Sequence, residues 1–321
     1  GQESAGMICS EKELGISDDH EGILVLPDNT EPGMHISEVL NPVFSSLELD
    51  ILPNRPDVLS HLGIAREIAI KTGQRLQKLE IPSNLNPKTK SETVQVHIDD
   101  PNGCPRYIAG VVKNVKVGPS PEWMGDALKC AGMRPINNLV DISNYVLLEM
   151  GHPTHIFDFE KFPEKTVCVR KAKKGEKFIT LDEEKHTLNA EHLLITNGKS
   201  PVALAGIMGG LDSAVADTTS TVLIESAYFD PVTIRKGSKN LGMLTESSRR
   251  FERGADPEGT VTAFWRIVTL LRELAGGELA SEMMDSYPKK IKPPSIILRK
   301  SKLENIGGFS IPVKFIEKTL T

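Results

Sequence analysis

The chain has 321 residues, which is more than one typical domain, so two or three domains are expected. Its net charge of −5 lacks the global basic signature of a nucleic-acid binder, so any RNA binding has to be local. The four cysteines form no C-x-x-C pair, which argues against a zinc ribbon and a disulfide framework. The apolar runs are too short to span a bilayer and no signal segment opens the chain, which indicates a cytoplasmic protein without a membrane partner.

The first part of the chain contains one clear element. Residues 1–40 are rich in loops with short apolar stretches, as is typical of the edge of a β-rich module. An apolar strand is predicted over 47–52. Asp57 is a good N-cap for a helix whose apolar residues recur at helical spacing until Gly73 ends it. The polar, Pro/Lys/Ser-rich stretch 83–93 marks a linker.

A second domain is predicted to follow the linker. Apolar alternation and short apolar runs predict strands over 94–98, 107–117 and 221–225, with further strands and turns over 166–196. Proline starts, N-caps and glycine stops predict helices over 119–132, over 141–149, from Asp230-Pro231, and from Asp256-Pro257 to Gly276. The chain starts without an initiator methionine and stops within what looks like a helix, so we expect it to be part of a longer polypeptide.

The segment GHPTHIFD (151–158) places His152 and His155 three residues apart, with Asp158 just beyond. Pro153 disfavours a regular helix, on which the two rings would share a face. A tetrahedral metal site needs three or four ligands, and no other tight Cys/His group is available. Metal binding is therefore disfavoured, whereas a catalytic or substrate-contacting histidine and an ordinary loop histidine both remain open.

Three glycines cluster in ALAGIMGG (203–210). Glycine permits positive φ and close approach of a backbone or ligand, but the segment matches neither dinucleotide- nor phosphate-binding patterns. A tight turn beside the core and a pocket floor lined by Ala205 and Gly206 both fit the pattern.

Glu225 directly follows an apolar run at the end of a predicted buried strand. A carboxylate there must be paired, hydrogen-bonded or solvated in a cleft. An ion pair with Arg235 or Arg249 and a functional role both remain open.

Two local basic segments, KGSKN (236–240) and SSRRFER (247–253), interrupt the otherwise acidic composition. A solvated helix face is the usual interpretation of such a segment. The same side chains would also suit phosphate contacts to a nucleic acid, since Lys and Arg position a backbone without reading bases. The candidate phosphate contacts are Lys236, Lys239, Arg249 and Arg250.

Five segments together resemble one family, the bacterial phenylalanyl-tRNA synthetase beta subunit, in whose order they occur. They are GMICSEKELGISDDHEGILVLP (6–27), LPNRPDVLSHLGIARE (52–67), MRPINNLVDISNYVLLEMGHPTHIFD (133–158), LAGIMGG (204–210) and LTESSRRFERGADP (244–257). Each segment alone is modest evidence, but five long ones that cover nearly the whole chain in order are very specific.

The resemblance implies an α+β, multidomain fold. Residues 1–40 would be the C-terminal part of an inserted, β-rich tRNA-binding module of oligonucleotide-binding (OB) type, and 41–82 the remainder of a small α/β N-terminal domain. After the linker, 94–288 would form the editing domain, with mixed β-sheets and helices. Residues 289–321 would start a truncated following domain.

The resemblance also implies the function and the partners. The family's beta subunit pairs with an alpha subunit that carries the aminoacylation site, in an alpha2beta2 phenylalanine–tRNA ligase that acts on tRNA(Phe). No class II synthetase signature occurs in this chain, so it should not aminoacylate, and ATP and Mg are expected only for the full synthetase. The editing domain would hydrolyse tyrosine wrongly attached to tRNA(Phe), without a cofactor, and no DNA partner is expected.

Transferred residue by residue, the resemblance implies an editing site. His155 matches the family's editing histidine, whereas His152 falls where relatives commonly carry glutamine and is given no role. Glu225 matches the glutamate that reads the tyrosine hydroxyl. Ser143 and Asn144 match a Thr-Asn pair near the scissile bond, with serine retaining the hydroxyl. The implied pocket residues are Ala205, Gly206 and Ala227; no metal ligand is implied.

The chemistry of these residue types agrees with the implied roles. Glu225 would accept a hydrogen bond from the tyrosine hydroxyl, and a bound phenylalanine would leave the carboxylate unpaired at a cost of about 1–3 kcal/mol or more. Ala205 and Gly206 could offer N–H groups to the ester carbonyl, and His155 could position the attacking water or act as general base, with positioning ranked first. Two alternatives are a tRNA-binding and assembly scaffold with an inactive pocket, and a metal-dependent hydrolase that uses both histidines.

Overall fold

The computed structural model describes residues 6–14, 20–39, 46–79, 81–82, 85, 87 and 90–320. The chain divides into two compact units, residues 1–47 and 48–321. The domain boundary expected at residue 40 and five positions of the expected linker, 83, 84, 86, 88 and 89, lie outside the described residues.

The first unit contains one short helix, α1 (Ile36–Val39), and turns. Its described residues form no strand, although the sequence predicted a β-rich edge. Ile23 and Val25 are 58% and 79% exposed. The N–H of Leu24 donates to the carbonyl of Cys9, and this backbone hydrogen bond is an isolated one among the described residues. An apolar stretch becomes a strand only where a neighbouring strand pairs with it, and here the described residues supply none.

The second unit opens with the 3₁₀ turn η1 (Pro56–Val58) and helix α2 (His61–Thr72). The prediction that Asp57 is the N-cap of this helix is wrong. Its carboxylate instead accepts from Arg55 at 2.9 Å, and the hydroxyl of Ser60 accepts from the Gly63 N–H at 2.9 Å and caps the helix. The predicted stop at Gly73 is confirmed, since this residue ends the helix with a φ of 70°.

The strand predicted over 47–52 is absent. These residues have no strand pairing, and Leu47 and Leu52 are 86% and 63% exposed. Without a partner strand, the apolar pattern stays an extended loop.

Within the described residues, the strands of the second unit form two five-stranded sheets and a hairpin. The outer sheet has the order β1 (Gln95–Ile98), β4 (Thr166–Lys171), β7 (Leu193–Thr196), β8 (Pro201–Leu204), β9 (Met208–Gly209). The central sheet has the order β11 (Glu278–Leu279), β2 (Arg106–Lys113), β10 (Thr221–Tyr228), β3 (Thr154–Asp158), with β12 (Met284–Ser286) also paired to β2. The hairpin consists of β5 (Lys177–Ile179) and β6 (Lys185–Thr187). The strands predicted over 94–98, 166–196 and 221–225 are thus confirmed. The strand predicted over 107–117 ends earlier, at Lys113, because Asn114 adopts a φ of 61°.

The helices of the second unit were predicted in part: the helix predicted over 141–149 begins at Asn138, and the helices over 246–253 and 300–307 were not predicted. They are α3 (Glu122–Cys130), α4 (Asn138–Met150), α5 (Pro231–Leu241), α6 (Glu246–Arg253), α7 (Gly259–Ala275), α8 (Lys300–Gly307) and α9 (Val313–Leu320), with 3₁₀ turns η2 (Phe159–Lys161) and η3 (Leu211–Ser213). Asp230 caps α5 as predicted, accepting from the Thr233 N–H at 2.8 Å. The start predicted at Asp256-Pro257 is wrong by two residues, because Asp256 caps a turn through the Glu258 N–H and α7 begins only at Gly259. None of the helices in the described residues is long and apolar enough to cross a membrane.

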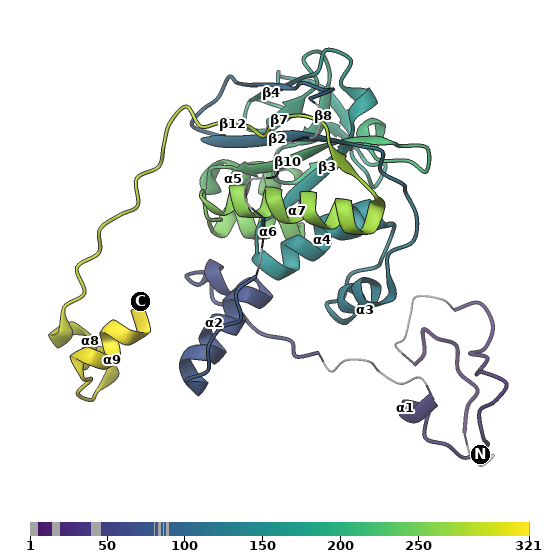
Figure 1. The fold of residues 1–321 in the computed structure, drawn as a ribbon, viewed down its shortest axis with the longest axis vertical. Helices are drawn as coiled ribbons and strands as arrows, with labels where there is room; N and C mark the ends of the chain where they lie inside the picture. The colour runs from purple at the N-terminus through teal and green to yellow at the C-terminus, as the bar shows by residue number, and fades with distance from the viewer. Residues whose placement is uncertain are drawn as a thin grey trace. The chain divides into compact units, whose positions relative to one another are not determined.

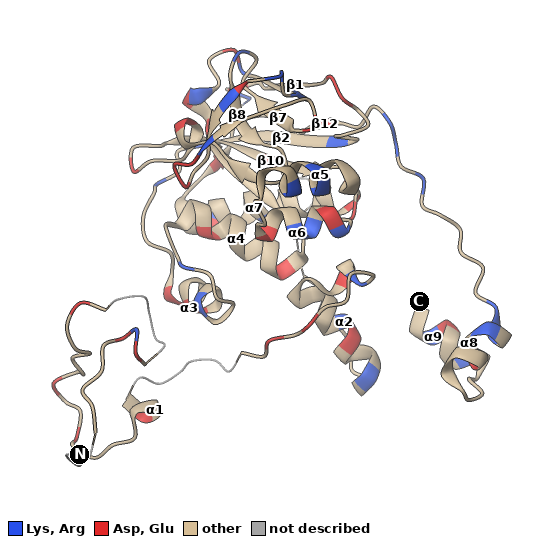
Figure 2. Ribbon diagram, turned by 180° about the vertical axis from the view of Figure 1, so that it is seen from behind, with Lys and Arg blue, Asp and Glu red and all other residues tan. Residues whose placement is uncertain are grey.

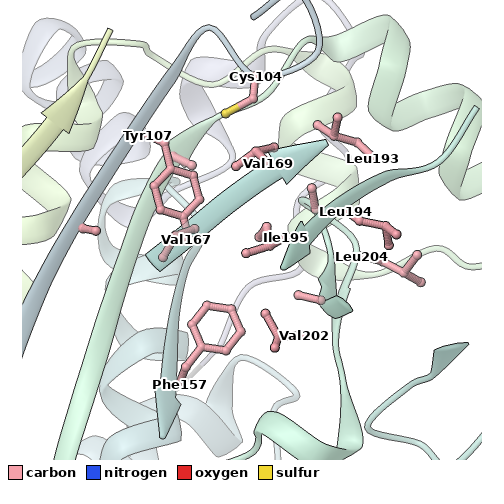
Figure 3. Packing of buried hydrophobic residues seen from close by; sticks show 14 of the residues in the cluster. Cys104, Tyr107, Phe157, Val167, Val169, Leu193, Leu194, Ile195, Val202 and Leu204 are labelled. Atoms are coloured by element: carbon pink, nitrogen blue, oxygen red, sulfur yellow. The ribbon is translucent and has the colours of Figure 1, made fainter. Parts of the chain in front are cut away.

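Side chains alternate between the two faces of the central sheet and build two cores. Figure 1 shows the layers: the outer sheet, the central sheet, and then α7 and α4. The inner face, which contacts the outer sheet, carries Leu223 and Ala227 together with Tyr107 and Phe157, of which the last two are labelled in Figure 3. The helix face carries Ile108, Ile156, Val222 and Ile224, packed on α3, α4 and α7. Glu225 lies two residues from Leu223 and from Ala227 on β10, and His155 lies two residues from Phe157 on β3. Because side chains alternate along a strand, both also point between the two sheets.

Candidate active site between the two sheets

Glu225 lies in the middle of β10, on the inner face, and is 6% exposed. Among the residues that the structure describes, no ion pair reaches it, so the pairing with Arg235 or Arg249 considered from the sequence is wrong. Its partner is the hydroxyl of Tyr107, which donates to Oε2 at 3.1 Å. Burial raises the pKa of Glu225 to about 8, against a smaller lowering by the Tyr107 hydrogen bond.

His155 is directly opposite Glu225. The two residues are register partners on the antiparallel strands β3 and β10, and directly opposed side chains have Cβ atoms about 4.5–5.5 Å apart. The ring of His155 lies 4.3 Å from that of Phe157, centroid to centroid. Desolvation by burial lowers the pKa of His155 to about 4, so the imidazole is neutral at pH 7. A carboxyl group and a neutral imidazole thus share one face of one strand pair.

A glycine in the outer sheet makes room for the histidine. A Cβ built on Gly209 would lie 2.7 Å from Cε1 of His155 and 2.9 Å from Cδ1 of Leu181. Leu181 follows β5, donates its N–H to the Gly209 carbonyl at 3.1 Å, and is 41% exposed. The β5–β6 hairpin therefore contacts the site beside His155, and any side chain at position 209 would displace the ring.

The turn that contains Ala205 and Gly206 joins β8 to β9. Gly206 has a φ of +66°, and a Cβ there would meet Phe229, Ile234 and Phe251 at 2.9–3.0 Å. The space that glycine leaves is filled by the protein's own side chains. The hypothesis that Ala205 offers its N–H to a ligand is wrong, because this N–H donates to Leu193 O at 3.0 Å and Ala205 is fully buried.

The N–H of Gly206 has no acceptor among the described residues, and it remains a candidate donor. Its carbonyl is held by the hydroxyl of Ser247 on α6 at 3.2 Å, and that of Ile207 by Thr245 at 2.9 Å. Helix α6 thus fixes the turn. The three atoms nearest to a Cβ built on Gly206 belong to Phe229, Ile234 and Phe251, and not to His155 or Glu225.

Ser143 lies across the sheet from this pair. It belongs to α4, and its hydroxyl donates to Thr154 O at 2.7 Å and lies 3.0 Å from the Thr154 hydroxyl. Thr154 shares the helix face with Ile156, so the sheet separates Ser143 from the inner-face side chains of Glu225 and His155. Asn144, the next residue on α4, is partly buried and has no hydrogen bond to either of them in the described part of the chain.

Two further residues of the site escaped sequence reasoning. Tyr107 was recognised only as the start of a strand, and Gly209 only as part of a glycine cluster. Their roles depend on strand register: Tyr107 is paired with Ala227, which is 1% exposed, two residues along β10 from Glu225. Alternation on both strands was the available signal, but register between strands is decided by the fold.

The four candidate phosphate contacts differ in exposure. Lys236 and Lys239 are exposed on α5, and Arg249 on α6 is 38% exposed and lies 3.8 Å from Glu246 (Figure 2). Arg250 is only 6% exposed, and its guanidinium donates to Leu59 O at 3.1 Å and to Glu246 at 2.6 Å. Arg250 is therefore committed to holding residues near α2 against α6 and is not available to a phosphate.

His152 lies apart from the site. It is 3% exposed, its ring nitrogens have no hydrogen-bond partner among the described residues, and burial lowers its pKa to about 4. Its ring packs edge-on against Phe251, with centroids 6.3 Å apart. The described residues contain no group of three or more His, Cys, Asp or Glu that could hold a metal ion.

Two cavities lie elsewhere on the unit. One of about 390 Å³ and one of about 310 Å³ share Lys290 and Ile291 as lining residues. Neither is lined by Glu225, His155 or Gly206. They are therefore separate from the candidate active site.

The arrangement can bind a polar group of a substrate and assist addition of water. The Glu225 carboxyl can exchange hydrogen bonds with a hydroxyl that enters between the sheets. A neutral imidazole can accept a hydrogen bond from a water molecule. Together they suit hydrolysis of a substrate that carries a hydroxyl in an otherwise apolar part.

Comparison with known proteins agrees with the motifs. The family model described as "B3/4 domain" matches residues 103–276. Proteins named phenylalanine–tRNA ligase beta subunit are similar to the chain: 44% identity in Syntrophus aciditrophicus and 45% in Geobacter sulfurreducens, each over 97% of this chain, and 43% in Thermotoga maritima over 96%. In each case the match covers 39% of the relative, so the chain spans about two fifths of their length.

A solved N-terminal fragment of the phenylalanyl-tRNA synthetase beta-subunit from Pyrococcus horikoshii is a distant structural neighbour. It has 18% identity and a TM-score of 0.41, over 83% of this chain and 72% of that chain. The family model, by contrast, covers more than half of the chain and includes β2, β3 and β10. The chain therefore belongs to the B3/4 domain family, and the resemblance to phenylalanine–tRNA ligase beta subunits that its motifs predicted is confirmed.

Proposed function

We propose that this chain hydrolyses tyrosine from mischarged tRNA(Phe), as the editing part of a phenylalanine–tRNA ligase beta subunit. The observation that carries the proposal is the cross-strand pair of Glu225 and His155 on the inner face of the central sheet. A buried carboxyl group beside a neutral imidazole suits recognition of a phenol and hydrolysis of an ester. The names of the similar proteins supply the reaction context.

Glu225 would read the substrate. Tyrosine and phenylalanine differ by one hydroxyl, which an apolar pocket discriminates poorly. When ionised, Glu225 accepts a hydrogen bond from the tyrosine hydroxyl, and a bound phenylalanine leaves the carboxylate desolvated without that partner. The omission costs about 1–3 kcal/mol, which corresponds to a preference of about five- to 150-fold for tyrosine.

His155 would position the attacking water. Its pKa of about 4 keeps the ring neutral at pH 7 and makes the imidazolium costly to form. A group with so low a pKa is a weak general base but a good hydrogen-bond acceptor. The low pKa therefore favours the positioning of water by His155 over proton abstraction. The candidate donor to the developing oxyanion is the N–H of Gly206.

The rest of the function belongs to the complete enzyme. We propose that the whole beta subunit pairs with the alpha subunit in an alpha2beta2 cytoplasmic ligase, where the alpha subunit aminoacylates tRNA(Phe) with ATP and Mg. Editing itself requires no cofactor in this proposal. The exposed Lys236, Lys239 and Arg249 on α5 and α6 are the proposed phosphate contacts.

Single-turnover deacylation of tyrosyl-tRNA(Phe) by excess protein tests the proposal. Wild-type chain and the assembled two-subunit enzyme would be compared with Glu225→Gln and His155→Ala, with phenylalanyl-tRNA(Phe) as the matched substrate and a chelator in a parallel series. Fast release of tyrosine alone, unaffected by the chelator and reduced at least tenfold in both variants, is the expected result. Equal rates for wild type and both variants in the assembled enzyme would refute the editing role and support a tRNA-binding scaffold.

A further inference from the structure

Among the described residues, Tyr107 is the one side chain that forms a hydrogen bond with Glu225. It lies on β2, opposite Ala227, and so sits diagonally across from Glu225 on the same face. The side chain is fully buried in the core between the two sheets, in the same cluster as Val167 (Figure 3). A diagonal neighbour on adjacent strands is within reach of an aromatic side chain, and the phenol hydroxyl lies 3.1 Å from Oε2.

The hydrogen bond occupies only one oxygen of Glu225. Oε1 has no hydrogen-bond partner among the described residues. A carboxylate has two oxygens, each able to accept hydrogen bonds. Tyr107 therefore fixes Oε2 and leaves Oε1 as the acceptor that can serve an incoming hydroxyl.

We propose that Tyr107 is a positioning residue for tyrosine recognition: its hydroxyl orients Glu225 and favours the ionised carboxylate, so that Oε1 can accept from the substrate phenol. The proposal rests on the editing function proposed above. It assigns to a core tyrosine, which cannot itself reach solvent, a role in choosing between two amino acids.

The surroundings of Glu225 give the hydrogen bond from Tyr107 a large influence on the charge of the carboxyl group. The other titratable groups near it are Cys104, just before β2, and His155 on β3; the facing strands β4, β7 and β8 contribute apolar side chains to the core. Burial raises the pKa of Cys104 well above its ordinary value and lowers that of His155 to about 4. Glu225, with a pKa of about 8, is then the member of this group that titrates between pH 6.5 and 9.

Removal of the Tyr107 hydroxyl should raise the pKa of Glu225 further, since a hydrogen bond to the charged form favours that form. Hydrogen bonds to charged groups are roughly twice as strong as neutral ones. We therefore expect the pH dependence of tyrosine release to move upward by about one pH unit in Tyr107→Phe, with a rate about tenfold below wild type at pH 7.

The test is single-turnover release of tyrosine from tyrosyl-tRNA(Phe) by the assembled two-subunit enzyme, from pH 6.5 to 9, after subtraction of spontaneous hydrolysis. Wild type, Tyr107→Phe, Glu225→Gln and the control Tyr228→Phe would be compared. Tyr228 is on β10 but on the other face, so its variant should follow the wild-type profile. An upward shift in Tyr107→Phe, with recovery toward the wild-type rate at pH 9, supports the role.

Three results separate the possible failures. If the rate of tyrosine release in Tyr107→Phe is reduced by the same factor at every pH, the inference is overturned, because a purely structural defect lowers the rate without changing its pH dependence. Equal rates in wild type and Glu225→Gln refute the editing function itself, and the inference with it. If Tyr107→Phe does not fold, 3-fluorotyrosine at position 107 keeps the volume and donates more strongly, so the profile should move downward; an unchanged profile there overturns the inference.

Discussion

The most direct test of the electrostatics is the pH dependence of stability in Glu225→Gln. Glutamine keeps the shape of the side chain and an oxygen that can accept from Tyr107, but it does not titrate. The substitution therefore isolates the free energy of burying a carboxyl group between the two sheets. This measurement needs only the folded chain, without tRNA.

The magnitude follows from the pKa. The carboxyl group ionises near 4.5 in the unfolded chain and near 8 in the native state. Because the native state holds the proton more tightly, Glu225 contributes least to stability at high pH, and the loss develops as pH rises from 4.5 to 8. Each pKa unit corresponds to about 1.4 kcal/mol, so from pH 5 to pH 8 the wild type should lose about 3–4 kcal/mol relative to the variant.

Two buried histidines change the stability with pH in the opposite direction to Glu225. The pKa values of His152 and His155 are lowered from 6.5 to about 4, so their contribution to stability is present above pH 6.5 and is lost as pH falls toward 4. Both proteins contain these histidines. Their effect therefore cancels when the two unfolding free energies are subtracted.

Urea unfolding followed by tryptophan fluorescence measures the difference. Trp123 on α3 and Trp265 on α7 are the only two tryptophans, and both report on the unit that contains the site. Unfolding at pH 5, 6, 7 and 8 would be compared among wild type, Glu225→Gln and Glu160→Gln, whose carboxylate is exposed. A difference between wild type and Glu225→Gln that stays constant within about 1 kcal/mol from pH 5 to pH 8 would refute the reasoning.

Three further predictions concern the surroundings of the site. Gly209→Ala places a Cβ 2.7 Å from the ring of the site histidine and should slow tyrosine release at least tenfold, whereas Gly118→Ala, which meets nothing within 4 Å, should not change the rate. Arg250→Ala should lower the unfolding free energy by about 2–4 kcal/mol in urea without reducing tRNA affinity, and a weakened affinity at unchanged stability would contradict the structural role. The double variant Lys236→Ala, Lys239→Ala should weaken tRNA binding in filter-binding titrations. The slope of the logarithm of the binding constant against the logarithm of the salt concentration should become shallower by about one unit per lysine, and an unchanged slope would exclude these residues from the interface.

Local chemistry allowed most elements of the second unit to be predicted. Asp230 with Pro231, and the glycines at 73 and 276, act within one turn of the chain, so such caps and stops can be recognised without knowledge of the fold. The prediction was wrong where two local signals competed. Asp57 is a good cap by type, but its carboxylate pairs with Arg55, and Ser60 caps the helix instead.

Apolar segments were predicted correctly as strands only where the fold supplies a partner strand. Residues 221–225 form a strand because β2 and β3 flank β10 on both sides. Residues 47–52 have a similar apolar content but remain a loop, because no described strand pairs with them. Apolar pattern alone does not supply the backbone partners that a strand needs.

The sequence by itself determined the family, the glycine stops of several helices, and the presence of an unusual carboxylate at Glu225, because each depends on residue types that are adjacent along the chain. The tertiary structure alone decided what surrounds that carboxylate. Register between β10 and its neighbours places His155 opposite Glu225 and Tyr107 diagonal to it, while the sheet separates Ser143 from both. A shift of one residue in either register would turn these side chains to the other face, and such long-range pairing is fixed only when the two cores pack.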